Sequence, residues 1–291
     1  MEIAFWGTRG SYPVPGHGTL VYGGNTACHS VLAGDRMIII DAGTGIINLG
    51  KKLTEGTKPL NLALFLSHLH IDHTSGLLYF RPNFRKTTNL HIFGPIDSRG
   101  SVKTTLEDLT LPPSHPISIN TMGMNFTCNS ITDGNSIIWR QGAANPVIMD
   151  PAEQAESEDV VIKTMFNNRH PVDGVLNFRI EHKNKAYVYA TDVEGDEDTG
   201  DPDLIRFAAG ADLMAHDGQY TSAAYKAVHR GWGHSTAAMA VKTAQMAGVK
   251  QLALIHHEPA HDDAKLAVME EETKRLFANS FFAKEGQVVH L

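Results

Sequence analysis

Three histidines and one aspartate lie within six residues of each other, in the segment His68-Leu69-His70-Ile71-Asp72-His73. This segment directly follows the apolar run Leu62–Leu66, which is typical of a buried β-strand. Imidazole nitrogens and carboxylate oxygens are ligands that zinc, manganese and iron all accept. Four such groups packed this tightly would repel one another, or leave buried polar atoms unpaired, unless something bound them. The chain is therefore expected to fold with a strand end opening onto a metal site.

More candidate ligands follow apolar strand-like runs later in the chain. They are His170, Asp192 and the adjacent pair His256 and His257. A single histidine or aspartate after a strand is usually an ordinary loop residue. Three such positions, in a chain that also has the His68–His73 cluster, together indicate one site with several ligands.

Hydrophobic periodicity predicts strands and helices along the whole chain. The predicted strands are Ile3–Trp6, Ala27–Leu32, Met37–Ile40, Leu62–Leu66, Leu90–Phe93, Val160–Phe166, Val175–Ile180, Ala186–Tyr189, Leu213–Ala215, Leu252–Ile255 and Val288–His290. The predicted helices are Ile46–Leu53, Pro202–Ala209, Ser222–His229, Thr236–Met246 and Asp263–Phe277. Early strands followed by alternating strands and helices indicate an α/β sandwich of mixed sheets covered by helices.

Residues 97–159 have a less regular pattern, with Pro112-Pro113, Pro116 and Pro146 ahead of the acidic stretch Glu153–Asp159. We interpret this segment as an inserted lid or oligomerisation surface, or else as connecting loop. It contains no linker that would divide the chain, so residues 1–291 are expected to form a single domain.

The composition narrows the class of function. The net charge is −7 and the chain has 2 cysteines and 16 histidines. An acidic chain disfavours long nucleic acid as a partner, because phosphate backbones attract basic surfaces. So few cysteines indicate a reducing compartment, and no apolar stretch is long enough to span a membrane. We therefore expect a cytoplasmic protein with no membrane partner.

With these motifs in hand, the chain resembles the metallo-β-lactamase-fold hydrolases nearly end to end. The His68–His73 segment is similar to the signature motif of that family, and Asp41-Ala42-Gly43-Thr44-Gly45 resembles its early strand-end aspartate. The resemblance implies a four-layer αββα sandwich of the metallo-β-lactamase type. It also implies that Asp41 orients a metal-bound histidine without binding metal itself.

The resemblance further implies two divalent metal ions. One would be held by His68, His70, His170 and Asp192, and the other by Asp72, His73, Asp192 and His256, with Asp192 bridging. His257 is the alternative to His256. Zinc is the first expectation, although manganese or iron would accept the same nitrogen and oxygen donors. A hydroxide bridging two such ions is a nucleophile at neutral pH.

A second motif, Gly231-Trp232-Gly233-His234-Ser235-Thr236, resembles that of the phosphodiesterase branch of the family. This branch includes the tRNA 3′-processing endonuclease RNase Z and hydrolases of cyclic phosphodiesters. The resemblance implies that His234 contacts the phosphate or protonates the leaving oxygen. Ala215-His216-Asp217-Gly218 resembles the partner motif, with Asp217 where the nuclease usually has glutamate. The predicted catalytic residues are therefore His234, Asp217 and Asp72.

The leading hypothesis is a dinuclear hydrolase acting on a small, cyclic phosphodiester. RNase Z-like cleavage at RNA 3′ ends is one alternative, but only 21 residues lie between His170 and Asp192, where that nuclease carries its tRNA-gripping arm. A metal-dependent binding or sensor protein without turnover is another. Arg9, in a loop after the first strand, is a candidate for phosphate contact, or else a surface arginine. The sequence leaves a homodimer open.

Overall fold

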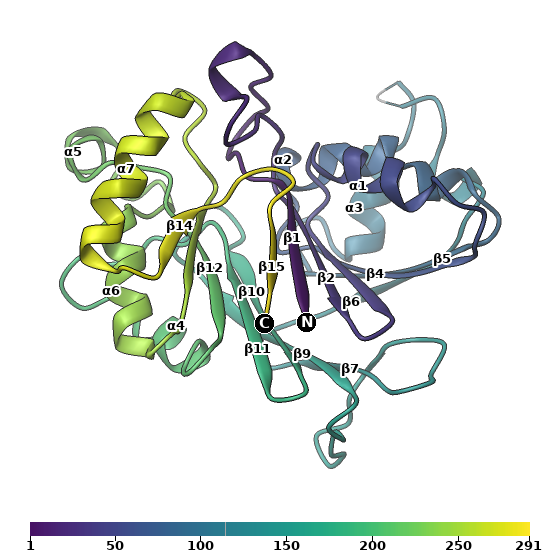
Figure 1. Ribbon diagram of the computed structural model, residues 1–291. Helices are drawn as coiled ribbons and strands as arrows, with labels where there is room; N and C mark the ends of the chain where they lie inside the picture. The colour runs from purple at the N-terminus through teal and green to yellow at the C-terminus, as the bar shows by residue number, and fades with distance from the viewer. Residues whose placement is uncertain (114) are drawn as a thin grey trace.

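The computed structural model describes residues 1–113 and 115–291. Two mixed β-sheets lie face to face at its centre (Figure 1). The first sheet has the order β15 (Val288–His290), β1 (Glu2–Gly7), β2 (Cys28–Ala33), β3 (Arg36–Ile40), β4 (Leu60–Phe65), β5 (Thr88–Gly94) and β6 (Asn125–Ser130). The second has the order β14 (Ser280–Phe282), β13 (Leu252–Ile255), β12 (Leu213–Asp217), β11 (Lys185–Ala190), β10 (Val175–His182), β9 (Val160–Asn167), β7 (Ser136–Trp139) and β8 (Val147–Ile148).

Helices cover the outer face of each sheet, so the molecule has four layers (Figure 1). The α-helices are α1 (Ile46–Leu53), α2 (Ile71–Thr74), α3 (Val102–Leu109), α4 (Pro202–Phe207), α5 (Ser222–Ala224), α6 (Ala237–Ala247) and α7 (Asp263–Leu276). Short 3₁₀ turns span His17–Thr19, Ser75–Tyr79, Arg81–Phe84 and Ile119–Thr121, and a π-helical turn spans Tyr225–His229. This is the αββα arrangement that the resemblance implies.

Three hydrophobic clusters hold the layers together. The central cluster joins the inner faces of both sheets, with Ile38 and Phe65 from the first sheet and Phe178 and Tyr187 from the second. Another lies between the second sheet and helices α4, α6 and α7, and a third lies between the first sheet and helices α1 and α3. Burying one apolar face of each sheet and helix in this way is the main favourable contribution to folding.

Residues 97–159 carry the chain from one sheet to the other. They contain helix α3, the edge strand β6 of the first sheet, and strands β7 and β8 of the second. The sequence pattern missed these elements because β6 is a polar, partly exposed edge strand and β8 is only two residues long. Part of this segment is therefore built into the two sheets, and the rest of its described residues form helix α3, a 3₁₀ turn and connecting loops.

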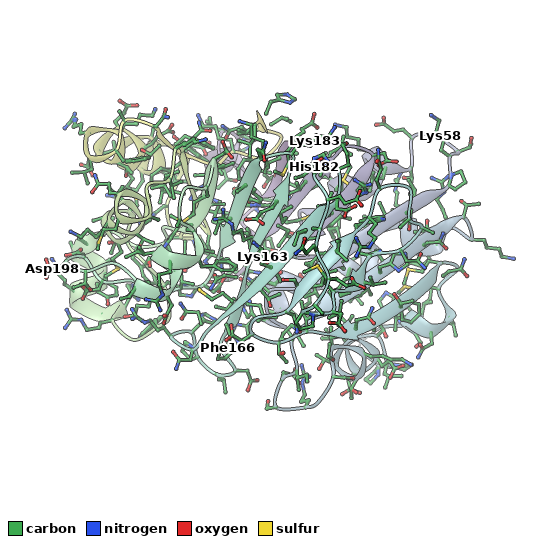
Figure 2. All side chains as sticks on the ribbon, turned by 90° about the horizontal axis from the view of Figure 1, so that it is seen from below. Lys58, Lys163, Phe166, His182, Lys183 and Asp198 are labelled. Atoms are coloured by element: carbon green, nitrogen blue, oxygen red, sulfur yellow. The ribbon has the colours of Figure 1, made fainter. Side chains whose placement is uncertain are left out.

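The parallel strands determine where a site can form. Strands β3, β4, β5 and β6 run parallel in one sheet, and β11, β12, β13 and β14 run parallel in the other. The carboxyl ends of parallel strands meet at one edge, which is where α/β proteins bind ligands. Viewed from below, Lys163 of β9 and Lys183 of the turn after β10 lie at the surface (Figure 2). Every helix among the described residues is too short or too polar to cross a lipid bilayer.

Candidate metal centre

The strand ends bring the predicted site residues together at the edge between the two sheets. Asp41 follows β3, His68–His73 follows β4, and His170 follows β9. Asp192 follows β11, Asp217 ends β12, and His256 follows β13. Residues that are far apart in the sequence therefore meet because six strands end at the same place.

Three of these residues have a backbone conformation that is unusual for anything but glycine. Their φ angles are positive: 59° at Asp41, 53° at Asp192 and 59° at His256. This left-handed region costs a side-chain-bearing residue about 1 kcal/mol or more, and it persists where the surrounding structure enforces it. In each case it turns a side chain back over the strand end, toward the space between the sheets. Backbone strain of this kind collects at functional sites.

One group of donors consists of His68, His70 and His170, whose ligand atoms lie within 4.8 Å of one another. His170 Nδ1 donates a hydrogen bond to the carbonyl of Gly233 over 3.2 Å, which leaves its Nε2 as the free ring nitrogen. That Nε2 lies 3.2 Å from Nδ1 of His70. In the neutral rings, two nitrogens with lone pairs so close together need a proton or a cation between them.

A second group consists of Asp72, His73 and His256, whose donor atoms are equally close. Asp192 lies between the two groups. Its Oδ1 is 3.8 Å from His68 Nε2 and 3.6 Å from His170 Nε2. Its Oδ2 is 3.2 Å from His73 Nε2. A carboxylate placed in this way can bridge two cations.

The donor atoms fit metal ions on two independent grounds. First, Nε2 of His68 and Nε2 of His73 are buried and make no hydrogen bond to any described residue. An unpaired buried nitrogen costs free energy that a metal bond would recover. Second, the donors are histidine nitrogens and carboxylate oxygens, the set that zinc, manganese and iron accept.

The pKa values of the cluster residues also indicate that this site favours added positive charge. Burial alone would lower the pKa of His73, but the nearby carboxylates outweigh it and raise that pKa well above its ordinary value. Burial likewise opposes the charge on His256, yet Asp192 and Asp72 raise its pKa to about 9. Burial raises the pKa of Asp192, but the surrounding imidazoles, His256 foremost, hold that pKa well below its usual range. Divalent cations would supply this charge in exchange for the ring protons.

Asp41 orients one of the candidate ligands. Its Oδ2 accepts hydrogen bonds from His73 Nδ1 at 2.7 Å, from the Tyr189 hydroxyl at 2.7 Å and from Ser67 Oγ at 2.9 Å. The bond to His73 fixes the ring tautomer and directs Nε2 into the cluster. Sequence reasoning missed Ser67 and Tyr189. The available signal was a tyrosine on the core-facing side of a buried strand, where its hydroxyl needs a partner.

His234 and Asp217 form a buried pair beside the cluster. His234 Nδ1 donates to Asp217 Oδ2 over 2.7 Å. The other oxygen of Asp217 accepts from the backbone N–H groups of Gln219 and Ser235, so the carboxylate is held at both ends. His234 Nδ1 is 3.9 Å from Asp192 Oδ1. His234 thus lies next to the donor groups.

The structure separates His256 from His257. His256 Nε2 lies 3.3 Å from Asp72 Oδ2, and its Nδ1 is 3.0 Å from the side-chain oxygen of Gln219. His257 points the other way, with Nε2 bonded to the carbonyl of Ala283 at 2.9 Å. The two side chains therefore point in different directions, and only His256 lies in the cluster.

The expectation for Arg9 is wrong in both of its forms. Arg9 is completely buried, so it is not a surface residue. Its guanidinium group donates to the backbone carbonyls of Gly23, Glu258 and His261, at 2.7, 3.0 and 2.6 Å respectively. These bonds direct the guanidinium group away from the cluster. Arg9 therefore connects the loops that carry these carbonyls and does not reach a phosphate. An arginine between Thr8 and Gly10 in a loop gives no sequence signal for this inward orientation.

An open cleft of ≈ 360 Å³ gives access to the cluster. It is lined by Ser11, His70, Ile71, Asp72, His170, Pro171, Asp192, Trp232, His234 and His256. Five of these are candidate ligands, and His234 lies among them. A smaller cavity of ≈ 90 Å³ adjoins it at His68 and His70 and extends to residues 95–99.

Comparison with known proteins points to one family. The family model described as the beta-lactamase superfamily domain matches residues 36–257, which is most of the chain. A protein named Ribonuclease Z from Picrophilus torridus is 25% identical over 312 aligned residues, covering 98% of this chain and 94% of that protein.

Solved structures show the same fold. The metallo-β-lactamase fold protein YhfI from Bacillus subtilis superposes with a TM-score of 0.65 and 19% identity, over 99% of this chain and 98% of that one. The short form of human tRNase Z superposes with a TM-score of 0.66 and 17% identity, over 100% of this chain and 99% of that one. These similarities confirm the predicted fold class.

Proposed function

The chain belongs to the β-lactamase superfamily, and from this premise we propose that it is a dinuclear metal-dependent phosphodiesterase that acts on a small, cyclic phosphodiester. The observation that carries the proposal is the His234–Asp217 pair, held at 2.7 Å beside the histidine and aspartate donor groups. A thioester releases a thiolate, which departs without a proton, so thioester hydrolysis does not call for this histidine–carboxylate pair.

The metal ions would be held by the two donor groups described above. His68, His70 and His170 would bind one ion, Asp72, His73 and His256 the other, and Asp192 would contact both. When bound, the ions lower the pKa of a water nucleophile and neutralise charge on the phosphoryl oxygens. The buried, unpaired nitrogens of His68 and His73 support this assignment.

His234 would supply the proton that the leaving oxygen needs. In hydrolysis the P–O bond to the leaving alcohol breaks, and the alkoxide that forms is too basic to depart without a proton. His234 Nδ1 is engaged by Asp217, so Nε2 is the ring atom free to carry the transferable proton. The hydrogen bond from Nδ1 to the buried Asp217 carboxylate fixes the direction of the ring.

The volume of the cleft favours a small substrate. Its volume of ≈ 360 Å³ is at the lower end of the range for small-molecule sites. A cyclic phosphodiester places both ester oxygens in one compact ring, which suits a short distance between the donor groups and His234. The net charge of −7 also opposes binding of a long polyanion.

One observation favours a second candidate, cleavage at RNA 3′ ends. The relative named Ribonuclease Z matches almost the whole chain. Against it, residues between His170 and Asp192 fold into strands β10 and β11, joined by a turn at Lys183 and Asn184. This tight strand pair leaves little of that stretch for an arm that grips RNA.

Side-by-side assays distinguish the two candidates. Protein loaded with zinc, or with manganese, is given a cyclic nucleotide and a precursor tRNA at matched enzyme concentration. We expect turnover of the cyclic nucleotide, and loss of it in Asp192→Ala, which removes the shared carboxylate. A matched control is Asp35→Ala, an exposed aspartate in the turn between β2 and β3 that belongs to neither donor group. Cleavage of tRNA alone would favour the nuclease, and metal binding with neither activity would favour a sensor.

A further inference from the structure

Trp232 is the most exposed of the three tryptophans and lies beside the candidate metal centre. The chain has three tryptophans. Trp139 is buried, and Trp6 is half-buried with its indole N–H bonded to Ser30 Oγ. Trp232 is 54% exposed and lines the cleft together with Asp192 and His234. Such a large apolar surface left in water costs free energy that binding of another flat group would recover.

The loop that carries Trp232 is held firmly. Glu194 accepts hydrogen bonds from the backbone N–H of Gly231 at 2.8 Å and from that of Gly233 at 2.9 Å. Both glycines have positive φ angles, 84° and 86°, so the tight turn needs glycine on each side of the tryptophan. A β-carbon at Gly233 would also lie only 2.4 Å from His170 Nδ1.

The indole ring of Trp232 also packs against a pair of stacked aromatic side chains. His229 packs edge-on against Trp232, with ring centroids 4.7 Å apart. His229 in turn stacks on Tyr220 at 4.1 Å with an interplanar angle of 7°. An aromatic ring fixed by its loop and by a stacked pair loses little conformational freedom when a ligand binds, and this pre-organisation favours affinity.

The cleft therefore has a polar part and an apolar part. The donor groups and His234 form the polar part, while Ile71, Pro171 and Trp232 supply apolar surface. We infer that Trp232 is a specificity residue that stacks on a flat ring carried by the substrate, so that the preferred phosphodiester bears a nucleobase or an aryl group. This inference rests on the proposed function, because it takes the phosphate to lie at the donor groups.

Binding experiments test the inference without requiring turnover. Metal-loaded protein is titrated calorimetrically with thymidine 5′-monophosphate and with 2-deoxyribose 5-phosphate, which differ only in the base. Stacking of one base on an aromatic side chain predicts that the nucleotide binds about 5- to 150-fold more tightly. The nucleotide is also expected to quench the fluorescence of Trp232, and the sugar phosphate is not.

Three variants separate stacking from a structural role. Trp232→Leu keeps apolar bulk without a ring and should bind both ligands equally, whereas Trp232→Phe should keep most of the preference. Phe166→Ala, which removes an exposed aromatic residue outside the cleft (Figure 2), should bind like the parent protein. Metal content is measured for each variant, so that a disrupted centre is recognised.

Equal affinity of the parent protein for the two ligands, without quenching, would overturn the inference whatever the variants do. A base preference that survives in Trp232→Leu would overturn it as well. Base-dependent binding in a protein that hydrolyses no phosphodiester would support the role of Trp232 and count against the proposed function, so the two failures are distinguishable.

Discussion

Replacing His234 by alanine should slow hydrolysis in a way that depends on the leaving group. The variant removes the ring that Asp217 holds at 2.7 Å but removes none of the residues assigned to the metals. A positioned general acid contributes about 10²–10⁴-fold to the rate, so a substrate with an alkoxide leaving group should lose that factor in kcat. A p-nitrophenyl ester leaves as a stable anion without a proton, and its hydrolysis should be nearly unchanged.

Asp217→Asn gives an intermediate effect whose size follows from the contacts. The oxygen of the new amide would stay with the backbone N–H groups of Gln219 and Ser235, which turns the amide N–H toward His234 Nδ1. The charge-assisted bond that is lost contributes about 1.5–3 kcal/mol. Loss of this hydrogen bond from the protonated His234 ring should lower kcat on substrates with an alkoxide leaving group by about 10- to 150-fold.

The assay compares kcat for a cyclic nucleotide and for bis(p-nitrophenyl) phosphate, with metal content measured on the same samples. Equal losses on both substrates would refute the role of His234 as an acid. Loss of metal from His234→Ala would refute it in another way, because His170, Asp192 and His234 also lie close enough to hold an ion. An unchanged metal content with a selective loss on the cyclic nucleotide is the expected result.

Three further changes have expected outcomes. His256→Ala should bind about one metal ion fewer per chain than His261→Ala by elemental analysis, because only His256 belongs to a donor group. Arg9→Ala leaves three backbone carbonyls without their donor, and should lower the free energy of unfolding in urea by at least about 3 kcal/mol; a loss below about 1 kcal/mol would contradict the contacts. Burial lowers the pKa of His29 to about 3, so the unfolded chain binds this proton first as the pH falls below about 6.5. Stability should therefore decrease between about pH 6.5 and 3, by up to about 1.4 kcal/mol per pH unit more than in His29→Gln, and parallel pH profiles would refute this.

The positions of the candidate ligands could be predicted from the sequence where they follow strong apolar strands. His68–His73 stands directly after β4, and His256 directly after β13, so the periodicity of the strand places them at its carboxyl end. The signal was weaker for residues 97–159, whose strands are short or polar. A two-residue strand such as β8 has no periodicity to detect, and it forms only because a neighbouring strand supplies its hydrogen bonds.

The structural role of Arg9 could not be predicted from the sequence for a different reason. A loop arginine is normally solvated, and nothing local marks one whose guanidinium group is enclosed by carbonyls from residues about 250 positions away. The same holds for Glu194 and Tyr189, which fix the His234 loop and the Asp41 carboxylate through contacts between distant segments. Such residues act through partners that the chain brings near only when it folds.

The sequence by itself placed histidine and aspartate donors at strand ends, because residue type and strand periodicity are local properties. Its resemblance to a known family pointed to His234 and an acidic partner. Tertiary structure alone decided how these groups meet. It selected His256 over His257, turned Arg9 inward and set Trp232 at the mouth of the cleft. The physical reason is that direction, burial and distance between remote side chains depend on how two sheets pack, and no short stretch of sequence encodes that packing.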